Sequence, residues 1–241
     1  MTQQKIVKSK YKPYAKNTNE KSSWLRAAVL GSNDGIISIA GLVIGVASAT
    51  HSKTAVLTAG LAGIVAGALS MAAGEYVSVS TQRDTENALL AQEKQDLAQY
   101  PKEELNDLIS AYEADGLEPK IARTVAVELT KANAFTVHAD VDFHIDPKNL
   151  TNPWSSVIAS AGSFVAGALI PLIVIMIPVE TYTVPITFMS VIVALIVTGI
   201  LSAKISGTAN IFKSTLRVVA GGAIAMIVTY AIGNIFKVIG A

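Results

Sequence analysis

Sulfur and carboxylate side chains follow one face of a long helical stretch, and together they are donors that suit a metal cation. Steps of four or seven residues from Gly67 reach, in order, Met71, Glu75, Gln82, Glu86 and Glu93, and such steps return to the same helix face. The stretch begins as an apolar run and passes into polar sequence without a proline or a turn signal. It therefore predicts a track of ligands that starts inside a membrane and ends in water, better suited to a metal cation than to an organic substrate.

A further candidate ligand, Asp34, lies in the apolar stretch that precedes this one. The segment Asn33-Asp34-Gly35 falls about eight residues into a predicted span at 27–50, so Asp34 lies roughly 11 Å below the surface at 1.5 Å per residue. An ionisable residue at that depth is costly and is commonly functional. The alternative is a carboxylate that caps or packs a locally broken helix. Met71 and Glu75 are expected at a similar depth in the antiparallel neighbour.

Most acidic residues are concentrated in one segment. Of the 18 acidic residues, 14 lie between Arg83 and Asp146, where six Lys or Arg residues also occur, so the segment carries a charge of about −8. This sign favours cations and argues against a nucleic-acid partner. The chain has no cysteine, so carboxylate, imidazole, thioether or carbonyl groups must supply any metal ligands. The predicted ligands are Asp34, Met71, Glu75, Glu86, Glu93, Asp96, Glu104, Asp107, Asp140 and Asp142.

Two histidines, His138 and His144, end the acidic segment, and their role stays open. Acidic neighbours make each a candidate ligand. For any single carboxylate of this segment, an ordinary solvated face is the competing interpretation. The excess of negative charge as a whole favours metal capture.

The elements that must position these residues are predicted to be helices. The composition is 51% hydrophobic with a mean hydropathy of +0.46, and its apolar residues form long runs, which indicates an integral membrane protein. The breaks at 100–101 and 116–119 divide the acidic segment into helices at about 83–99, 102–115 and 119–143. The predicted fold is an all-α membrane protein with five transmembrane helices and a cytoplasmic three-helix metal-binding domain inserted between spans 2 and 3.

Four parts of the chain follow from this pattern. They are a basic cytoplasmic arm at 1–23, spans 1 and 2 at 24–82, the acidic helical domain at 83–146, and spans 3 to 5 at 147–241. The distribution of Lys and Arg places the amino terminus and the 204–217 connector in the cytoplasm, which leaves the carboxyl terminus outside. The first 23 residues lack the apolar core of a signal peptide. A bacterial inner membrane is the expected location.

Three motifs, WLRAAVLGSNDGIIS, AGALSMAAGEYVSVSTQRD and SFVAGALIPL, resemble the vacuolar iron transporter family, which includes yeast iron and manganese transporters and nodulin-like proteins. The resemblance runs from Trp24 to the end of the chain. It implies a homodimer that moves Fe²⁺, and often Mn²⁺, out of the cytosol in exchange for protons. It also implies a path along the dimer interface that uses Asp34 and Met71, with Glu75 beside it.

For the cytoplasmic glutamates, the resemblance is firmest at Glu93 and Glu104. Asp96 and Asp107 occupy positions where the family favours Glu, and Ala-Asp-Val-Asp at 139–142 replaces a Glu-rich segment. These departures keep oxygen ligands but shorten their reach, which leaves metal preference open between Fe²⁺ and Mn²⁺.

The expected function is therefore export of a divalent metal in exchange for protons. Asp34 is expected to be neutral without metal and ionised with it, so that metal binding releases protons. The expected partners are a second copy, lipid, divalent metal ions and protons, with no prosthetic group. A membrane-anchored metal-binding or sensing protein without transport is the alternative, and an exporter of small organic solutes is less favoured. The sequence shows no Ser-His-Asp arrangement, phosphate loop or zinc-type His spacing, so an enzyme is not expected.

Overall fold

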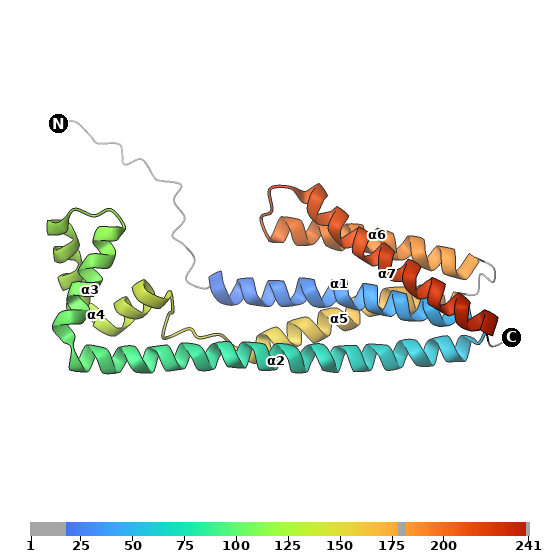
Figure 1. Cartoon of the computed structure of the whole chain (residues 1–241), viewed down its shortest axis with the longest axis horizontal. Helices are drawn as coiled ribbons and strands as arrows, with labels where there is room; N and C mark the ends of the chain where they lie inside the picture. The colour runs from blue at the N-terminus through green and yellow to red at the C-terminus, as the bar shows by residue number, and fades with distance from the viewer. Residues whose placement is uncertain (1–17, 178–181, 240–241) are drawn as a thin grey trace, which may run out of the picture.

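The computed structural model describes residues 18–177 and 182–239, and these ranges are helical apart from short connections. The helices are α1 (Thr18–Ala49), α2 (Lys53–Gln99), α3 (Pro101–Ala114), α4 (Pro119–Phe143), α5 (Pro153–Ile175), α6 (Thr183–Ile205) and α7 (Ile211–Ile239). Figure 1 shows α1, α5, α6 and α7 gathered along one part of α2, with α3 and α4 at its other end. Residues 1–17 of the predicted basic arm lie outside the described residues, and 18–23 already belong to α1.

Five of these helices are long and apolar enough to cross a membrane. They are α1 from Trp24, α2, α5, α6 and α7, and each coincides with one predicted span. The all-helical fold and the integral membrane character predicted from the sequence are therefore confirmed. Helix α2 is continuous over 47 residues, as the absence of a turn signal predicted, and only part of it is apolar.

Local sequence signals set the helix ends around the acidic segment. A proline stands in the first turn of α3, α4 and α5, where its missing N–H group is not needed. The side chain of Ser52 accepts a hydrogen bond from the Ala55 N–H and caps α2, and Asn152 caps α5 through the Trp154 N–H. The observed bounds of α3 and α4 agree with the predicted ranges to within one residue.

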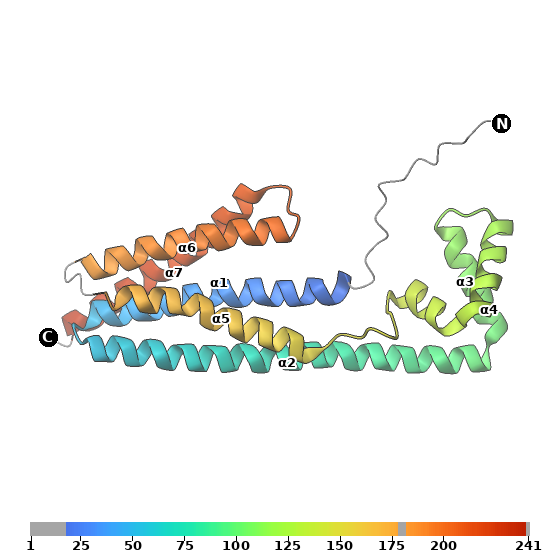
Figure 2. The ribbon, with the colours of Figure 1, turned by 180° about the vertical axis from the view of Figure 1, so that it is seen from behind.

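Helix α1 is the centre of the membrane bundle, and it contacts α2, α5, α6 and α7 (Figure 2). It approaches α5 so closely that a Cβ atom at Gly35 would overlap the carbonyl oxygen of Phe164. The ring of the same phenylalanine lies against Gly67 of α2. Gly35 and Gly67 therefore sit at one level of the bundle, and the side chain of Met71 packs against the cluster that contains Phe164.

Helices α3 and α4 have a small apolar core of their own, formed by Leu108, Ile109, Ala122 and Ala126. Helix α4 breaks at Asn133, where φ is −168° and ψ is 87°. The Asn133 side-chain oxygen accepts a hydrogen bond from the Thr136 N–H at 3.1 Å, so it caps a second helical part at 134–143. This break, which the sequence pattern did not predict, re-aims the last turns of α4.

Candidate metal centre

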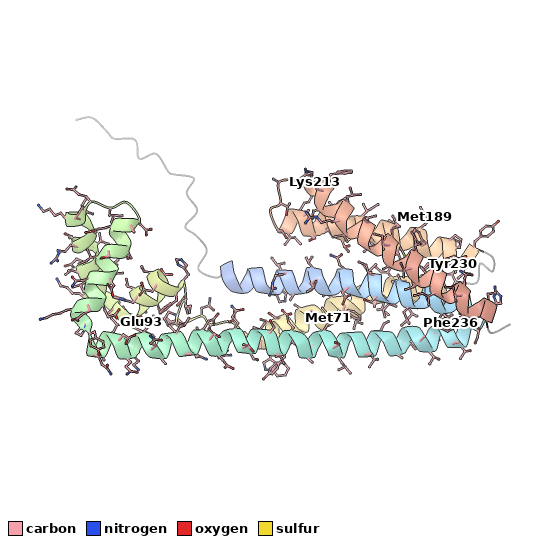
Figure 3. The ribbon with its side chains drawn as sticks, viewed as in Figure 1. Met71, Glu93, Met189, Lys213, Tyr230 and Phe236 are labelled. Carbon is pink, nitrogen blue, oxygen red and sulfur yellow. The ribbon has the colours of Figure 1, made fainter. Side chains whose placement is uncertain are left out.

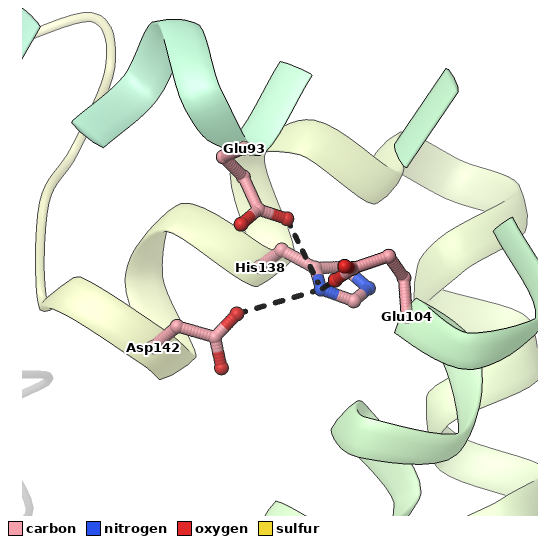
Figure 4. A group of neighbouring side chains, drawn as sticks. All are labelled: Glu93, Glu104, His138 and Asp142. Atoms are coloured by element: carbon pink, nitrogen blue, oxygen red, sulfur yellow. Dashed lines mark ion pairs between the residues drawn. The ribbon is translucent and has the colours of Figure 1, made fainter. Parts of the chain in front are cut away.

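Four ligand-type side chains converge where α2, α3 and α4 meet. Glu93 comes from α2, Glu104 from α3, and His138 and Asp142 from the second part of α4 (Figure 4). The Nδ1 atom of His138 lies 3.3 Å from Glu93 Oε1, 3.5 Å from Glu104 Oε2 and 3.5 Å from Asp142 Oδ2. One atom from each side chain lies within 4.8 Å of every other. We call these four residues the acidic–histidine group.

The group is closed on one side and open on the other. His138 is 1% exposed and Glu93 is 5% exposed, whereas the Asp142 side chain is about a third exposed at 33%. Glu93 Oε1 and both ring nitrogens of His138 are buried and have no hydrogen-bond partner among the described residues. Buried polar atoms without partners are costly and call for an explanation. An ion that enters from the Asp142 side would satisfy Glu93 Oε1 and His138 Nδ1, the ring nitrogen that faces the carboxylates.

The spacing of the donor atoms fits a bound metal ion. Ligand atoms at about 2.1 Å from one ion, in octahedral or tetrahedral geometry, lie about 3.0 to 3.4 Å from one another. The separations around His138 Nδ1, 3.3 to 3.5 Å, are close to this range and longer than a good N–H···O hydrogen bond. One imidazole and three carboxylates are donors that first-row divalent metals accept, whereas Mg²⁺ and Ca²⁺ favour all-oxygen sites.

The electrostatics of the group make Glu93 unusual. Burial is the largest cause that raises the pKa of Glu93 from the ordinary 4.5 to about 7. The negative charges of Glu104, Asp142 and Asp96 contribute the rest of this rise. A carboxylate crowded in this way is stabilised by a cation placed among the charges. Near neutral pH, a divalent ion and a proton therefore compete for Glu93.

Burial also raises the pKa of Glu104, and His138 acts in the opposite direction. Asp107 and Asp96 add to the rise, so both lie near the group although neither belongs to it. Asp140 lies outside the group, near Tyr112 on α3. Burial raises the pKa of the Tyr112 phenol most, and the negative charge of Asp140 is the next largest cause. Of the predicted ligands in the acidic segment, the structure brings together Glu93, Glu104 and Asp142.

Glu86, another predicted ligand, is engaged differently. Its Oε2 atom accepts hydrogen bonds from the Thr151 hydroxyl at 2.9 Å and from the Thr151 N–H at 3.3 Å. Its Oε1 atom accepts one from Gln82 Nε2 at 3.0 Å. Glu86 therefore lies on the same helix as Glu93, but its carboxylate binds the segment that follows α4 and is not part of the acidic–histidine group.

The three predicted ligands of the membrane part lie apart from the acidic–histidine group. Figure 3 shows Met71 in the bundle part of α2 and Glu93 towards its other end. Asp34 is half-buried and accepts a hydrogen bond from Ser38 Oγ at 2.8 Å. Glu75 is half-buried, and its Oε1 atom is buried without a hydrogen-bond partner among the described residues.

Two features of the site were not predicted from the sequence. His138 stands at the centre of the group, whereas the sequence left its role open; its spacing of four residues from Asp142 is the available signal. His144 ends α4 in the left-handed conformation, with its Nδ1 atom 3.0 Å from the Asp140 carbonyl oxygen, outside the group. The break at Asn133 had no signal beyond a capping residue inside a helical pattern.

Sequence comparisons with known proteins find one matching family and several relatives. The sequence profile of the VIT family matches residues 25–234. A protein of Acanthamoeba castellanii named vacuolar iron transporter is 39% identical over 220 residues, which cover 90% of this chain and 80% of the relative. Vacuolar iron transporter homolog 2.1 of Arabidopsis thaliana is 36% identical, covering 88% and 81% of the two chains. Vacuolar iron transporter homolog 2 of the same plant is 34% identical, covering 92% and 89%.

Proposed function

The chain belongs to the VIT family, and on that premise we propose that it is a membrane transporter of divalent iron, with Mn²⁺ as a second cargo. The observation that carries the proposal is the acidic–histidine group, whose buried atoms have no hydrogen-bond partner among the described residues. Its role is to gather metal from the cytosol before transport. Transport, not catalysis, is the activity.

The donor set supports a first-row metal as the cargo. Three carboxylates around one imidazole present an excess of negative charge to a divalent ion. The imidazole nitrogen of His138 favours Fe²⁺ and Mn²⁺ over the hard ions Mg²⁺ and Ca²⁺. Because the group contains no sulfur, it does not by itself select iron strongly over manganese. The thioether of Met71, a softer donor, is the point at which Fe²⁺ is preferred.

The continuity of α2 supports a route from the group into the membrane. Met71 and Glu93 lie on this one helix, 22 residues apart, which corresponds to about 33 Å at 1.5 Å per residue. Glu75 stands one turn from Met71 and has a buried oxygen with no hydrogen-bond partner in the described part of the chain. We therefore propose that the metal passes from the group to Glu75 and then to a site at Asp34 and Met71. Asp96 and Asp107 raise the local concentration of cations at the start of this route, beside the group.

Protons are the proposed counter-ions. Within the membrane bundle, Asp34 is the proposed residue at which metal and proton exchange. Metal would leave the cytosol as protons enter it. With the amino terminus and α3–α4 in the cytoplasm, five spans leave the carboxyl terminus outside. A bacterial inner membrane is the location proposed for this topology.

A second copy of the chain is the proposed partner in the membrane. In the single chain, the apolar part of α2 leaves large side chains exposed, among them Leu61, Val65, Leu69 and Val77. A homodimer that covers part of this surface would place two copies of Asp34 and Met71 along one path. Lipid covers the remainder.

Transport in liposomes tests the proposal. Purified protein reconstituted with an acidic interior should accumulate Fe²⁺, and less effectively Mn²⁺, only while the pH gradient lasts. Asp34→Asn should abolish this uptake. His138→Ala should weaken metal binding and raise the KM for Fe²⁺, whereas His144→Ala, the matched control, should change neither. Metal binding without uptake would instead identify a membrane-anchored metal-binding or sensing protein.

A further inference from the structure

The connection between α4 and α5, residues 144–152, is ordered by its own hydrogen bonds although it is not helical. The Ile145 N–H donates to the Ala139 carbonyl oxygen at 2.9 Å and closes the end of α4. The Lys148 N–H donates to the Asp146 side chain at 3.0 Å and forms a turn. Asn152 then caps α5. This connector is the covalent link between Asp142 of the acidic–histidine group and the membrane helix that packs most closely on α1.

Glu86 ties the connector to α2. Both oxygens of the carboxylate are engaged: Oε2 by the hydroxyl and the N–H of Thr151, at 2.9 and 3.3 Å, and Oε1 by Gln82 at 3.0 Å. Thr151 is 7% exposed, so the hydrogen bonds to it are shielded from water. Hydrogen bonds to an ionised carboxylate are stronger than those between neutral groups. The tie joins residues that are 65 positions apart in the sequence.

A second contact between α2 and the start of α5 lies ten residues before Glu86 on α2. The rings of Tyr76 on α2 and Trp154 in the first turn of α5 have centroids 5.3 Å apart. The polar tie and the ring contact together hold the start of α5 against α2. The start of α5 thus lies between the metal-gathering residues and the part of α1 that carries Asp34.

Glu86 is too far along α2 to share an ion with the acidic–histidine group. It precedes Glu93 by seven residues, or about 10 Å along the helix axis. Its two oxygens already accept three hydrogen bonds from its own chain. The group keeps its shape through other contacts, since α3 and α4 pack together through Leu108 and Ala122. Loss of the tie would therefore release the connector without dismantling the metal centre.

We infer that Glu86 and Thr151 are positioning residues that hold the connector and the start of α5 on α2, so that metal gathered by the group passes into the membrane path. This inference rests on the transport function proposed above. It assigns Glu86 a role in transfer and none in metal binding. It also makes Thr151, a residue with no metal-binding chemistry expected of it, necessary for transport.

The test uses the full chain in liposomes and measures the rate of Fe²⁺ uptake against Fe²⁺ concentration. Thr151→Val, which keeps the shape but loses the hydroxyl, should lower the maximal rate by about tenfold or more, the effect of one charge-assisted hydrogen bond. The KM for Fe²⁺ should stay within about twofold of that of the unmodified chain, and so should the Kd for Mn²⁺ measured on the same variant in detergent. A twofold change is well below the effect of one such hydrogen bond. Thr151→Ser, which restores the hydroxyl, should recover the rate.

Glu86→Ala should behave as Thr151→Val does, and Asp84→Ala, which removes an exposed carboxylate from the same helix, is the matched control. A normal maximal rate in Thr151→Val, or a Kd that weakens in step with the rate, overturns the inference while leaving the transport function intact. Failure of Thr151→Ser to recover the rate overturns it as well. If the unmodified chain binds Mn²⁺ but takes up no Fe²⁺, the transport function itself fails and the inference falls with it.

Discussion

Acidification should weaken metal binding at the acidic–histidine group chiefly through Glu93. Burial and the charges around it raise the pKa of this carboxyl to about 7, so Glu93 binds a proton near neutral pH when no metal is present. A divalent ion binds the ionised form, and the proton must leave. The affinity for metal therefore falls as the pH falls through 7. Substitution of Glu93 by Gln removes the titrating group while keeping the shape of the side chain.

The size of the effect follows from the pKa. With a pKa of about 7, the ionised fraction of Glu93 falls from about three quarters at pH 7.5 to about one tenth at pH 6.0. Affinity for metal should fall about eightfold over this interval from Glu93 alone, since affinity is proportional to the ionised fraction. A glutamate with the ordinary pKa of 4.5 would change its ionised fraction by only about 3% over the same interval. The difference between these two expectations is readily measurable.

Calorimetric titration of the full chain in detergent with Mn²⁺, at both pH values, measures the effect. Repeating each titration in buffers with different ionisation enthalpies counts the protons released on binding. Glu93→Gln should bind more weakly at both pH values, and its affinity ratio between them should be about eightfold smaller than that of the unmodified chain. If the two ratios are equal, Glu93 does not carry the displaced proton, and the argument from burial is wrong.

Two further substitutions test how the group and the bundle are built. Asn133→Ala should let α4 run straight and weaken Mn²⁺ binding about fivefold, the equivalent of one lost cap. Asn133→Asp should keep the cap and the affinity for Mn²⁺. Equal affinities of the two variants in calorimetry would contradict this. Gly35→Ala should lower the melting temperature in detergent, because the added methyl group overlaps the Phe164 carbonyl oxygen and overpacking costs about 1–3 kcal/mol. Gly162→Ala, where a Cβ atom meets nothing within 4 Å, should leave the melting temperature unchanged or raise it; a fall as large as that of Gly35→Ala would refute the packing argument.

The helices could be predicted from the sequence because their signals are local. Proline at the first position of α3, α4 and α5 announces where each helix begins. Long apolar runs mark the spans whatever their partners are. The single helix from membrane to acidic segment followed from the lack of any break between residues 54 and 99.

The membership of the acidic–histidine group could be predicted only in part, because it depends on how each helix is rotated against its neighbours. Glu93 and Asp96 differ by one helical turn and are both acidic, yet only Glu93 joins the group. The break at Asn133 turns His138 and Asp142 together towards Glu93, and spacing along an unbroken helix does not foretell that turn. The partner of Glu86 could not be predicted either. Glu86 lies on the predicted helix, but the residue that binds it, Thr151, is remote in the sequence.

The unbroken 47-residue α2 connects the membrane bundle rigidly to the helices α3 and α4. At 1.5 Å per residue the helix is about 70 Å long, more than twice the thickness of the hydrocarbon core of a bilayer. Its part beyond Glu75 acts as a lever arm of about 36 Å, so a tilt of only about 5° at the membrane swings the far end by about 3 Å. Bilayer thickness, which influences helix tilt, thereby also affects the position of the end of α2 that carries Glu93.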